Sequence, residues 1–322
     1  MTPMVFLLIV GVIVLYFGAD WLVRGAAALG RSLGLSSMVI GLTVVSLGTS
    51  APELFVSVLA TLQGNADIAV GNVLGSNLAN IGLILGVTAV IRPLFVAQRV
   101  VRREMPIMIL VTLLLGPLLL DDQVSRFDGA CLVLLLVAYL TYVFQRGKKI
   151  PVALVSEYPR IAKATMAPED SRLWKNLGLL VAGTLGLILG GRAIVESAIF
   201  LSRSLGISEM TVGLTVVAVG TSLPELATSI MAAIRKETDI AVGNVIGSNI
   251  FNIAGVLGLT SVIKPIAVDP GVLGLQYPAV LALSFIALLV SLYPMLEGNF
   301  NIRRWEGAVL VVSYLALSLL IA

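Results

Sequence analysis

Histidine is absent from this sequence of 322 residues, and cysteine occurs only once, as Cys131. Without histidine, the imidazole ligands of the usual zinc, copper and non-haem iron sites are missing. A lone cysteine excludes an intrachain disulfide and a thiolate cluster. Charged residues make up only 12% of the chain, whereas soluble domains carry about 25%. The net charge of +3 is too small to indicate a nucleic-acid surface.

Hydrophobic residues make up 58% of the chain, and the mean hydropathy is +1.04. Apolar runs of about 18 or more residues are long enough to cross a bilayer, and their number predicts ten transmembrane helices. The first run is expected to be retained rather than cleaved as a signal peptide, because no Lys or Arg precedes it. The predicted spans are 4–23, 37–61, 68–91, 103–120, 127–145, 175–200, 209–234, 240–263, 272–293 and 303–321.

The segments that connect these spans alternate in charge. Seventeen Lys and Arg residues fall in the loops after the odd-numbered spans, and four fall on the opposite side. By the positive-inside rule, this partition predicts that both termini lie outside and that the loop 146–174 is a cytoplasmic linker. At under about 30 residues, this linker is too short for a regulatory domain of ordinary size.

An internal repeat relates the two halves with an offset of 172 and no gaps. Segment 38–93 matches segment 210–265 at 32 of 56 positions. Because each half carries five spans, the second half must enter the membrane from the opposite face. The sequence therefore predicts an all-α membrane protein of two inverted five-helix repeats, residues 1–145 and 175–322, which is the arrangement of secondary transporters with a midplane site.

Two acidic residues, Glu53 and Glu225, lie deep in apolar spans, at equivalent positions of the repeat. A charge at the bilayer centre costs at least about 2.5 to 3.5 kcal/mol on insertion scales. A packing role needs no carboxylate, so these two side chains are the first candidates for a functional site.

Oxygen donors surround each glutamate in the sequence. Pro52 has no N–H to give the carbonyl of Gly48, which leaves carbonyl oxygens near Ser46 available to a ligand. Oxygen donors with two carboxylates suit Ca²⁺ and Na⁺ and disfavour soft metals. The candidate donors are Ser46 (carbonyl), Thr49, Ser50, Glu53, Ser76 and Asn80 in the first half, and Ala218 (carbonyl), Thr221, Ser222, Glu225, Ser248 and Asn252 in the second.

Other polar and small residues of the repeat are expected to serve packing. Asn72, Asn77, Asn244 and Asn249 lie on other helix faces and are predicted to bond backbone groups and neighbouring helices. The repeated glycines fit close helix–helix packing at least as well as a functional role; they are Gly71, Gly75, Gly243 and Gly247.

The paired GTSxPE and GN(V/I)xGSN segments resemble the alpha repeats of the cation/calcium exchanger superfamily, in particular prokaryotic sodium/calcium exchanger-like proteins. The resemblance covers the whole chain. It implies a plasma-membrane (inner-membrane) antiporter, not an enzyme, that exports Ca²⁺ against entering Na⁺. It also implies that the first and sixth helices slide across the core, and it places ligands at the twelve positions named above. The ions are substrates, and neither a cofactor nor an obligatory protein partner is implied.

One departure from the family pattern leaves the driving ion open. Sodium/calcium exchangers commonly place an Asp at one of the two positions held here by Asn80 and Asn252. A H⁺/Ca²⁺ antiporter that uses the two glutamates as proton carriers is therefore the alternative. An intramembrane protease or lipid phosphatase is disfavoured because histidine is missing. A channel fits two inverted halves around one polar site less well than alternating access does.

Overall fold

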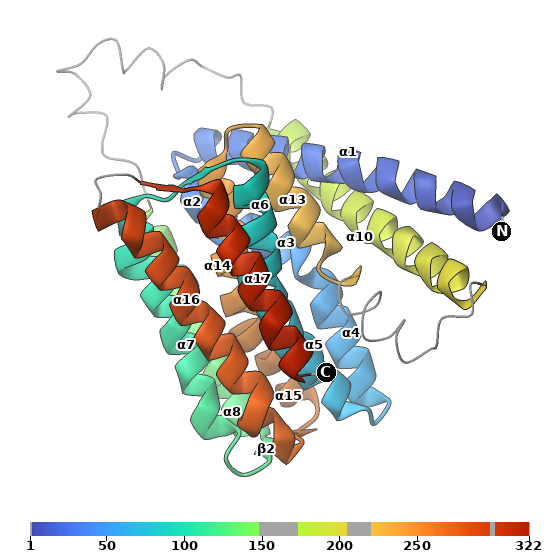
Figure 1. Ribbon diagram of the computed structural model, residues 1–322, viewed down its shortest axis with the longest axis vertical. Helices are drawn as coiled ribbons and strands as arrows, with labels where there is room; N and C mark the ends of the chain where they lie inside the picture. Colours follow the sequence, from blue (N-terminus) through green and yellow to red (C-terminus); the bar gives the residue numbers. More distant parts are fainter. Residues whose placement is uncertain (1, 148–172, 205–219, 297–299, 322) are drawn as a thin grey trace.

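A computed structural model of the chain describes residues 2–147, 173–204, 220–296 and 300–321. These residues form an elongated bundle of helices (Figure 1). Seven described helices are long and apolar enough to cross a membrane, and an eighth span is a helix pair bent by 42° at Ser50. The all-α membrane class predicted above is confirmed, whereas the count of ten spans is not. Span 209–234 lies partly outside the described residues, and 103–120 corresponds to a shorter helix.

The first half begins with the long helix α1 (Thr2–Ser32). The predicted second and third spans are composite, because each contains a π-helical turn (η) between α-helical parts. The elements are α2 (Ser37–Ile40), η1 (Gly41–Val45), α3 (Ser46–Thr49), α4 (Ala51–Leu62), α5 (Ala66–Leu78), η2 (Ala79–Ile84), α6 (Leu85–Ile91), β1 (Leu94–Phe95), η3 (Val100–Glu104), α7 (Met105–Leu118), β2 (Gln123–Val124) and α8 (Arg126–Arg146).

The second half repeats this order. Its π-helical turns η6 and η7 lie at about the same offset of 172 from η2 and η3, so the duplication extends to local distortions of the helices. The described elements are α10 (Leu173–Ser204), α13 (Leu223–Ile234), α14 (Thr238–Ile250), η6 (Phe251–Leu257), α15 (Gly258–Ile263), β3 (Ile266–Ala267), η7 (Val272–Gln276), α16 (Tyr277–Leu296), β4 (Asn301–Ile302) and α17 (Arg304–Ile321).

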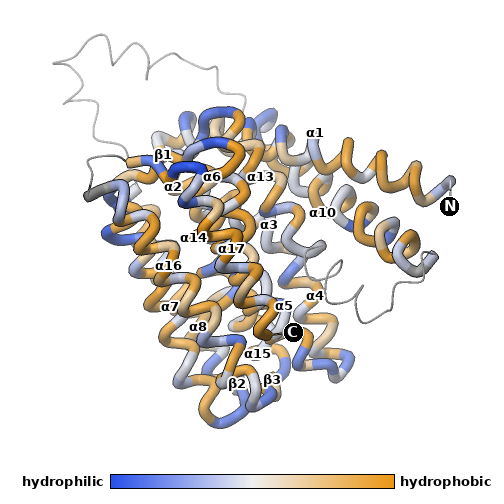
Figure 2. The backbone as a smooth tube through the Cα atoms, in the orientation of Figure 1, coloured by the Kyte–Doolittle hydropathy of each residue, from blue (hydrophilic) through white to orange (hydrophobic). Residues whose placement is uncertain are grey.

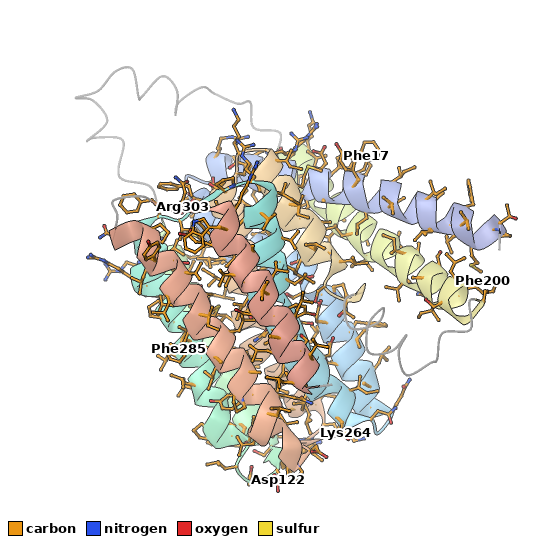
Figure 3. The ribbon with its side chains drawn as sticks, in the orientation of Figure 1. Phe17, Asp122, Phe200, Lys264, Phe285 and Arg303 are labelled. Atoms are coloured by element: carbon orange, nitrogen blue, oxygen red, sulfur yellow. The ribbon has the colours of Figure 1, made fainter. Side chains whose placement is uncertain are left out.

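Burial separates central helices from peripheral ones. The apolar stretch of α14–α15 is buried along its whole length, whereas only 17% of the corresponding window of α1 is buried. Hydrophilic residues gather toward the two ends of the bundle, and its flanks are mostly hydrophobic (Figure 2). Phe17, Phe200 and Phe285 project outward from α1, α10 and α16 (Figure 3). This distribution suits a protein whose flanks contact lipid and whose ends contact water.

Helices α1 and α10 pack side by side along an antiparallel seam (Figure 1). A Cβ atom added at Gly18 would lie 2.7 Å from the backbone nitrogen of Leu187, and one added at Gly183 would lie 2.5 Å from that of Leu22. Only glycine permits such close approach of two backbones. Gly11 and Gly190 contact each other in the same way. Because Gly183 and Gly190 stand 172 positions after Gly11 and Gly18, the seam is self-complementary between the two halves.

Two short antiparallel ladders join the halves at opposite ends of the bundle. Leu94 of β1 pairs with Ile302 of β4, and Val124 of β2 pairs with Ile266 of β3. The equivalent strands β1 and β3 lie at opposite ends of the molecule in Figure 2. A duplicated element that reappears at the opposite end is the signature of an inverted relationship between the halves.

Candidate functional site

The two intramembrane glutamates lie at matching breaks in α3–α4 and before α13. Ser50 precedes α4 with φ −84° and ψ 5°, and Ser222 precedes α13 with φ −88° and ψ 5°. This bridge region of the backbone is sparsely populated and common at active sites. A proline follows within two residues in both cases and ends the preceding hydrogen-bond ladder. The nearly equal angles show that the duplicated GTSxPE segments have closely similar backbones at both breaks.

Each glutamate lies in the first turn of its helix, where the positive end of the helix dipole favours a carboxylate. Both side chains are completely buried. Helix α4 packs on η6 of the second half, and α13 packs on η2 of the first half. The helix that carries each glutamate therefore packs on the π-helical turn that carries the asparagine of the other half, Asn252 in η6 and Asn80 in η2. Such π-turns often mark functional sites.

Hydrogen bonds between the halves bring several predicted ligands together. The Ser50 hydroxyl donates to Glu225 Oε1 at 3.1 Å. Thr49 Oγ1 lies 3.4 Å from Ser248 Oγ, and it donates to Asn244 Oδ1 at 3.1 Å. Thr221 Oγ1 lies 3.5 Å from Asn72 Oδ1, the equivalent contact. The site is thus assembled from both halves, and neither half contains it alone.

Several buried polar atoms at this place have no hydrogen-bond partner in the described part of the chain. A buried acceptor without a partner carries a desolvation cost of roughly 1 to 3 kcal/mol. Most of these atoms are oxygens, and they belong to side chains that approach one another from both halves, as expected for a cation-binding site. They are Glu53 Oε1 and Oε2, Glu225 Oε2, Asn80 Oδ1 and Nδ2, Asn252 Oδ1 and Ser222 Oγ.

The other buried acids are neutralised, which distinguishes them from the two glutamates. Asp20 pairs with Arg24 at 2.9 Å and with Arg235. Glu104 pairs with two arginines of its own segment, and Glu306 pairs with Arg303. Within the described residues, neither Glu53 nor Glu225 has an ion-pair partner. Two buried carboxylates without an ion-pair partner are candidates for binding a cation.

The remaining predicted ligands are placed as follows. Ser76 and Ser248 are buried on α5 and α14, one helical turn before the asparagines. The Ser46 carbonyl oxygen lies 3.3 Å from Thr49 Oγ1, so it is within reach of the same cluster. The Ala218 carbonyl lies outside the described residues. Thr221 and Ser222 are described, and Ser222 is buried.

The asparagines expected to serve packing do so. Asn72 donates to the Glu53 carbonyl at 3.2 Å and to Ser57, and Asn244 makes the equivalent bonds to the Glu225 carbonyl and Ser229. The Asn77 and Asn249 amides each donate to a backbone carbonyl. Gly243 and Gly247 also pack, with the backbone of Leu42 at 3.0 and 2.6 Å from an added Cβ. At Gly71 and Gly75, an added Cβ meets no described atom within 4 Å.

Asn77 also positions a predicted ligand, in addition to its packing role, and sequence reasoning missed this. Its Oδ1 accepts a hydrogen bond of 3.0 Å from Asn252 Nδ2. This bond uses the amide nitrogen of Asn252 and fixes the orientation of its side chain. The Oδ1 atom of Asn252 therefore stays available to accept a ligand. The only signal in the sequence is that Asn77 belongs to the repeated GSN segment.

Comparison with known proteins identifies the family of the chain. A family model described as "Sodium/calcium exchanger protein" matches residues 4–145 and 175–322. The chain belongs to the sodium/calcium exchanger protein family.

Relatives of this exchanger cover nearly its whole length. The inner membrane protein YrbG of Escherichia coli K12 is 42% identical over 88% of this chain and 87% of its own. The sodium/calcium exchanger MaX1 of Methanosarcina acetivorans is 32% identical over 96% of both. A solved structure of the sodium-calcium exchanger NCX_Mj, soaked with zero Na⁺ and Ca²⁺, matches with a TM-score of 0.82, 30% identity and 98% coverage of both chains. This exchanger is accordingly an integral membrane transporter of the cation antiport class and not an enzyme.

Proposed function

We propose that this exchanger moves Ca²⁺ in one direction against Na⁺ in the other, by alternating access to a site between the two halves. The observation that carries the proposal is the pair of buried glutamates, which have no ion-pair partner in the described part of the chain. Two carboxylates balance the charge of one Ca²⁺, and the oxygens around them supply the six to eight ligands that Ca²⁺ takes.

The proposed ion ligands come from both halves in equal number. Carboxylates hold the divalent charge, amide and hydroxyl oxygens complete the shell, and backbone carbonyls at the helix breaks serve Na⁺ when Ca²⁺ has left. No resident cofactor is needed, because the ions are the substrates. The proposed ligands are Ser46 (carbonyl), Thr49, Ser50, Glu53, Ser76 and Asn80, and Ala218 (carbonyl), Thr221, Ser222, Glu225, Ser248 and Asn252.

The movement that exposes this site is proposed to be a displacement of α1 and α10 against the remaining helices. The close seam at Gly18 and Gly183 supports their moving as one unit, since it joins the two helices to each other. Neither a protein partner nor a nucleic acid has a role in this mechanism.

The membrane arrangement is proposed from the charge partition. Residues 1–145 and 175–322 are the two inverted repeats in a prokaryotic plasma (inner) membrane. The linker 146–174 is cytoplasmic, and both termini lie outside. This orientation places Arg303 at the cytoplasmic end of the bundle and Asp122 and Lys264 at the outer end, in agreement with their separation in Figure 3.

Proton-driven Ca²⁺ exchange is the second candidate, and the asparagines favour it. With Asn at positions 80 and 252, the proposed ligand set carries two formal negative charges, which two protons can neutralise when Ca²⁺ leaves. A third Na⁺ would meet no further carboxylate.

The decisive experiment measures radioactive Ca²⁺ flux in proteoliposomes under an imposed Na⁺ gradient and, separately, under an imposed pH gradient. Flux driven by the Na⁺ gradient supports Na⁺/Ca²⁺ exchange. Flux driven only by the pH gradient selects the second candidate, and flux under neither gradient contradicts both.

A further inference from the structure

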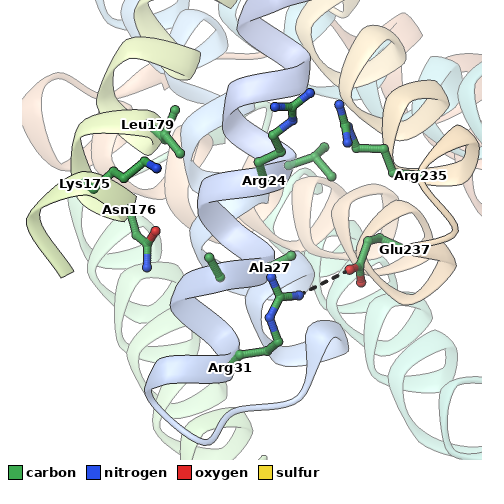
Figure 4. Close-up of a pocket in the computed structure, with 10 residues that line it drawn as sticks. Arg24, Ala27, Arg31, Lys175, Asn176, Leu179, Arg235 and Glu237 are labelled. Atoms are coloured by element: carbon green, nitrogen blue, oxygen red, sulfur yellow. Dashed lines mark ion pairs between the residues drawn. The ribbon is translucent and has the colours of Figure 1, made fainter. Parts of the chain in front are cut away.

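A basic cavity of about 290 Å³ lies between α1, α10 and the turn after α13, away from the ion site. Four cationic side chains line it, together with Glu237. In Figure 4, Arg24 and Arg31 stand on α1, Lys175 approaches from α10 on one side, and Arg235 from the end of α13 on the other. Three separate elements therefore direct positive charge into one cavity.

The charges within this cavity are only partly balanced. Arg31 pairs with Glu237 at 3.7 Å. Arg24 and Arg235 share the single carboxylate of Asp20. Among the described residues, Lys175 has no ion-pair partner. Within the described residues, the lining of this cavity therefore carries more positive than negative charge, which favours an anionic ligand.

The walls and surroundings of the cavity identify the kind of anion. Val23, Ala27 and Leu179 line it with apolar surface beside the cations. Trp174 is 84% exposed next to Lys175, at the start of α10. Exposed tryptophans at helix ends mark the headgroup level of a bilayer. A ligand at this depth has a charged group in the cavity and an apolar part beside the helices.

We infer that this cavity, the α1–α10–α13 basic pocket, binds the phosphate of an anionic phospholipid such as phosphatidylglycerol. Basic pockets between transmembrane helices at the cytoplasmic side are sites of this kind. Arg31 and Lys175 would contact the phosphodiester, and Val23, Ala27 and Leu179 the start of the acyl chains. The inference goes beyond ion exchange, and its binding test does not depend on the proposed function.

The position of the pocket gives the bound lipid a second role. One wall belongs to α1 and α10, and the other to the turn directly after α13, the helix that carries Glu225. A phosphate held by side chains from both walls connects the helix pair to the ion-binding core. If α1 and α10 move during exchange, as proposed above, the exchange rate will depend on the anionic lipid content of the membrane.

Direct binding is measured by native mass spectrometry of the purified full-length chain with added phosphatidylglycerol or phosphatidylcholine. The double variant Arg31→Gln/Lys175→Gln removes two cations that line the pocket. Each cation near a membrane surface strengthens the binding of an anionic lipid about fivefold. We therefore expect phosphatidylglycerol retention to fall about thirtyfold when the double variant loses two cations. Phosphatidylcholine retention should not change.

Arg304→Gln is the matched control, because it removes an exposed cation at the same end of the bundle, outside the pocket. Ala28→Glu is a second test that keeps every residue of these ion pairs while adding a carboxylate to the pocket lining. It should lower phosphatidylglycerol retention in a protein that still elutes as a single folded species. Equal retention in the wild type, the double variant and Ala28→Glu would overturn the inference.

Two further arms separate the lipid from other occupants. Inorganic phosphate at millimolar concentration should not displace phosphatidylglycerol, and displacement would make the pocket a site for a soluble anion instead. In proteoliposomes, Ca²⁺ flux of the wild type should change with phosphatidylglycerol content, and flux of the double variant should not. If the wild type binds the lipid but shows no Ca²⁺ flux, the proposed function is contradicted. The inference that the pocket binds lipid would still hold in that case.

Discussion

The hydroxyl of Ser50 in the first half donates a hydrogen bond of 3.1 Å to the carboxylate of Glu225 in the second half. The two residues are 175 positions apart, and both are buried. A hydrogen bond to a charged group contributes about 1.5 to 3 kcal/mol. This bond holds Glu225 in place and connects the two helix breaks, so the geometry of the proposed ion site depends on contact between the halves.

Replacing Ser50 with Ala should therefore weaken Ca²⁺ binding by about tenfold, which corresponds to about 1.4 kcal/mol. The variant removes the donor to Glu225 and a proposed ligand oxygen at once. Ca²⁺ affinity can be measured by calorimetry on the purified protein. Ser204→Ala is the control, because Ser204 is exposed and its hydroxyl donates to the Phe200 carbonyl of its own helix, with no other partner among the described residues. Equal affinity in the Ser50 variant and the wild type would remove Ser50 from the site.

Glu53→Gln and Glu225→Gln should each reduce Ca²⁺ transport to less than about a tenth of the wild-type rate. A tenfold loss corresponds to about 1.4 kcal/mol, and two unit charges 4 Å apart interact by about 4 kcal/mol at an effective dielectric constant of 20. Flux in proteoliposomes measures the effect. Glu196→Gln serves as control, because Glu196 is exposed on α10 and pairs with Arg192. Normal flux in either core variant, with correct insertion, would refute the assignment.

Asn252→Asp should raise the apparent Na⁺ affinity of exchange, and Asn80→Asp should do the same by the symmetry of the site. A carboxylate adds a formal charge beside each Na⁺, where the amide offers only a carbonyl dipole. Both side chains are buried, with Oδ1 lacking a partner among the described residues. Asn65→Asp, in the exposed turn before α5, is the control.

The asparagine variants are assayed by Ca²⁺ efflux against Na⁺ concentration and against pH. A protein driven by protons should instead show a shifted pH dependence, because the new carboxyl group binds protons. If neither dependence changes, Asn80 and Asn252 do not face the ions.

Gly18→Val and Gly183→Val should each destabilise the protein by about 1 to 3 kcal/mol, the usual cost of overpacking. At both positions the added side chain meets the backbone of the opposite helix, which cannot move aside as a flexible side chain can. Thermal unfolding in detergent measures the loss. Gly178→Val on the same α10 is the matched control, because an added Cβ there meets no described atom within 4 Å. A similar melting temperature in all three variants would contradict the close seam.

Introduced cysteines should report opposite sides of the membrane for the linker and the α7–α8 turn. In a Cys131→Ser background, which removes the exposed native thiol, Lys163→Cys should be labelled only from the cytoplasm and Asp121→Cys only from outside. Position 121 is preferable to Asp122, whose φ of 55° disfavours a cysteine. Labelling of both positions from the same face would contradict the inverted arrangement.

The sequence by itself determined the class of the protein and the identity of its central residues. Low charge and long apolar runs are direct consequences of a lipid environment, so the membrane class could be read without a structure. A duplication with 32 of 56 identical positions singled out Glu53 and Glu225. The proline two residues after each Thr-Ser pair marked the helix breaks, since proline removes a backbone donor wherever it occurs.

Only the tertiary structure decided how these parts meet. The hydrophobicity of α1 and α10 does not show that these two helices pack against each other. The role of their glycines depends on the backbone that lies opposite them, which only the folded structure gives. The bond from Asn252 to Asn77 joins residues 175 positions apart. The burial of Asp20 between two arginines also depends on the approach of α13 to α1. Contacts between residues far apart in the sequence depend on how the helices pack in space. The residue pattern along a single helix does not specify that packing.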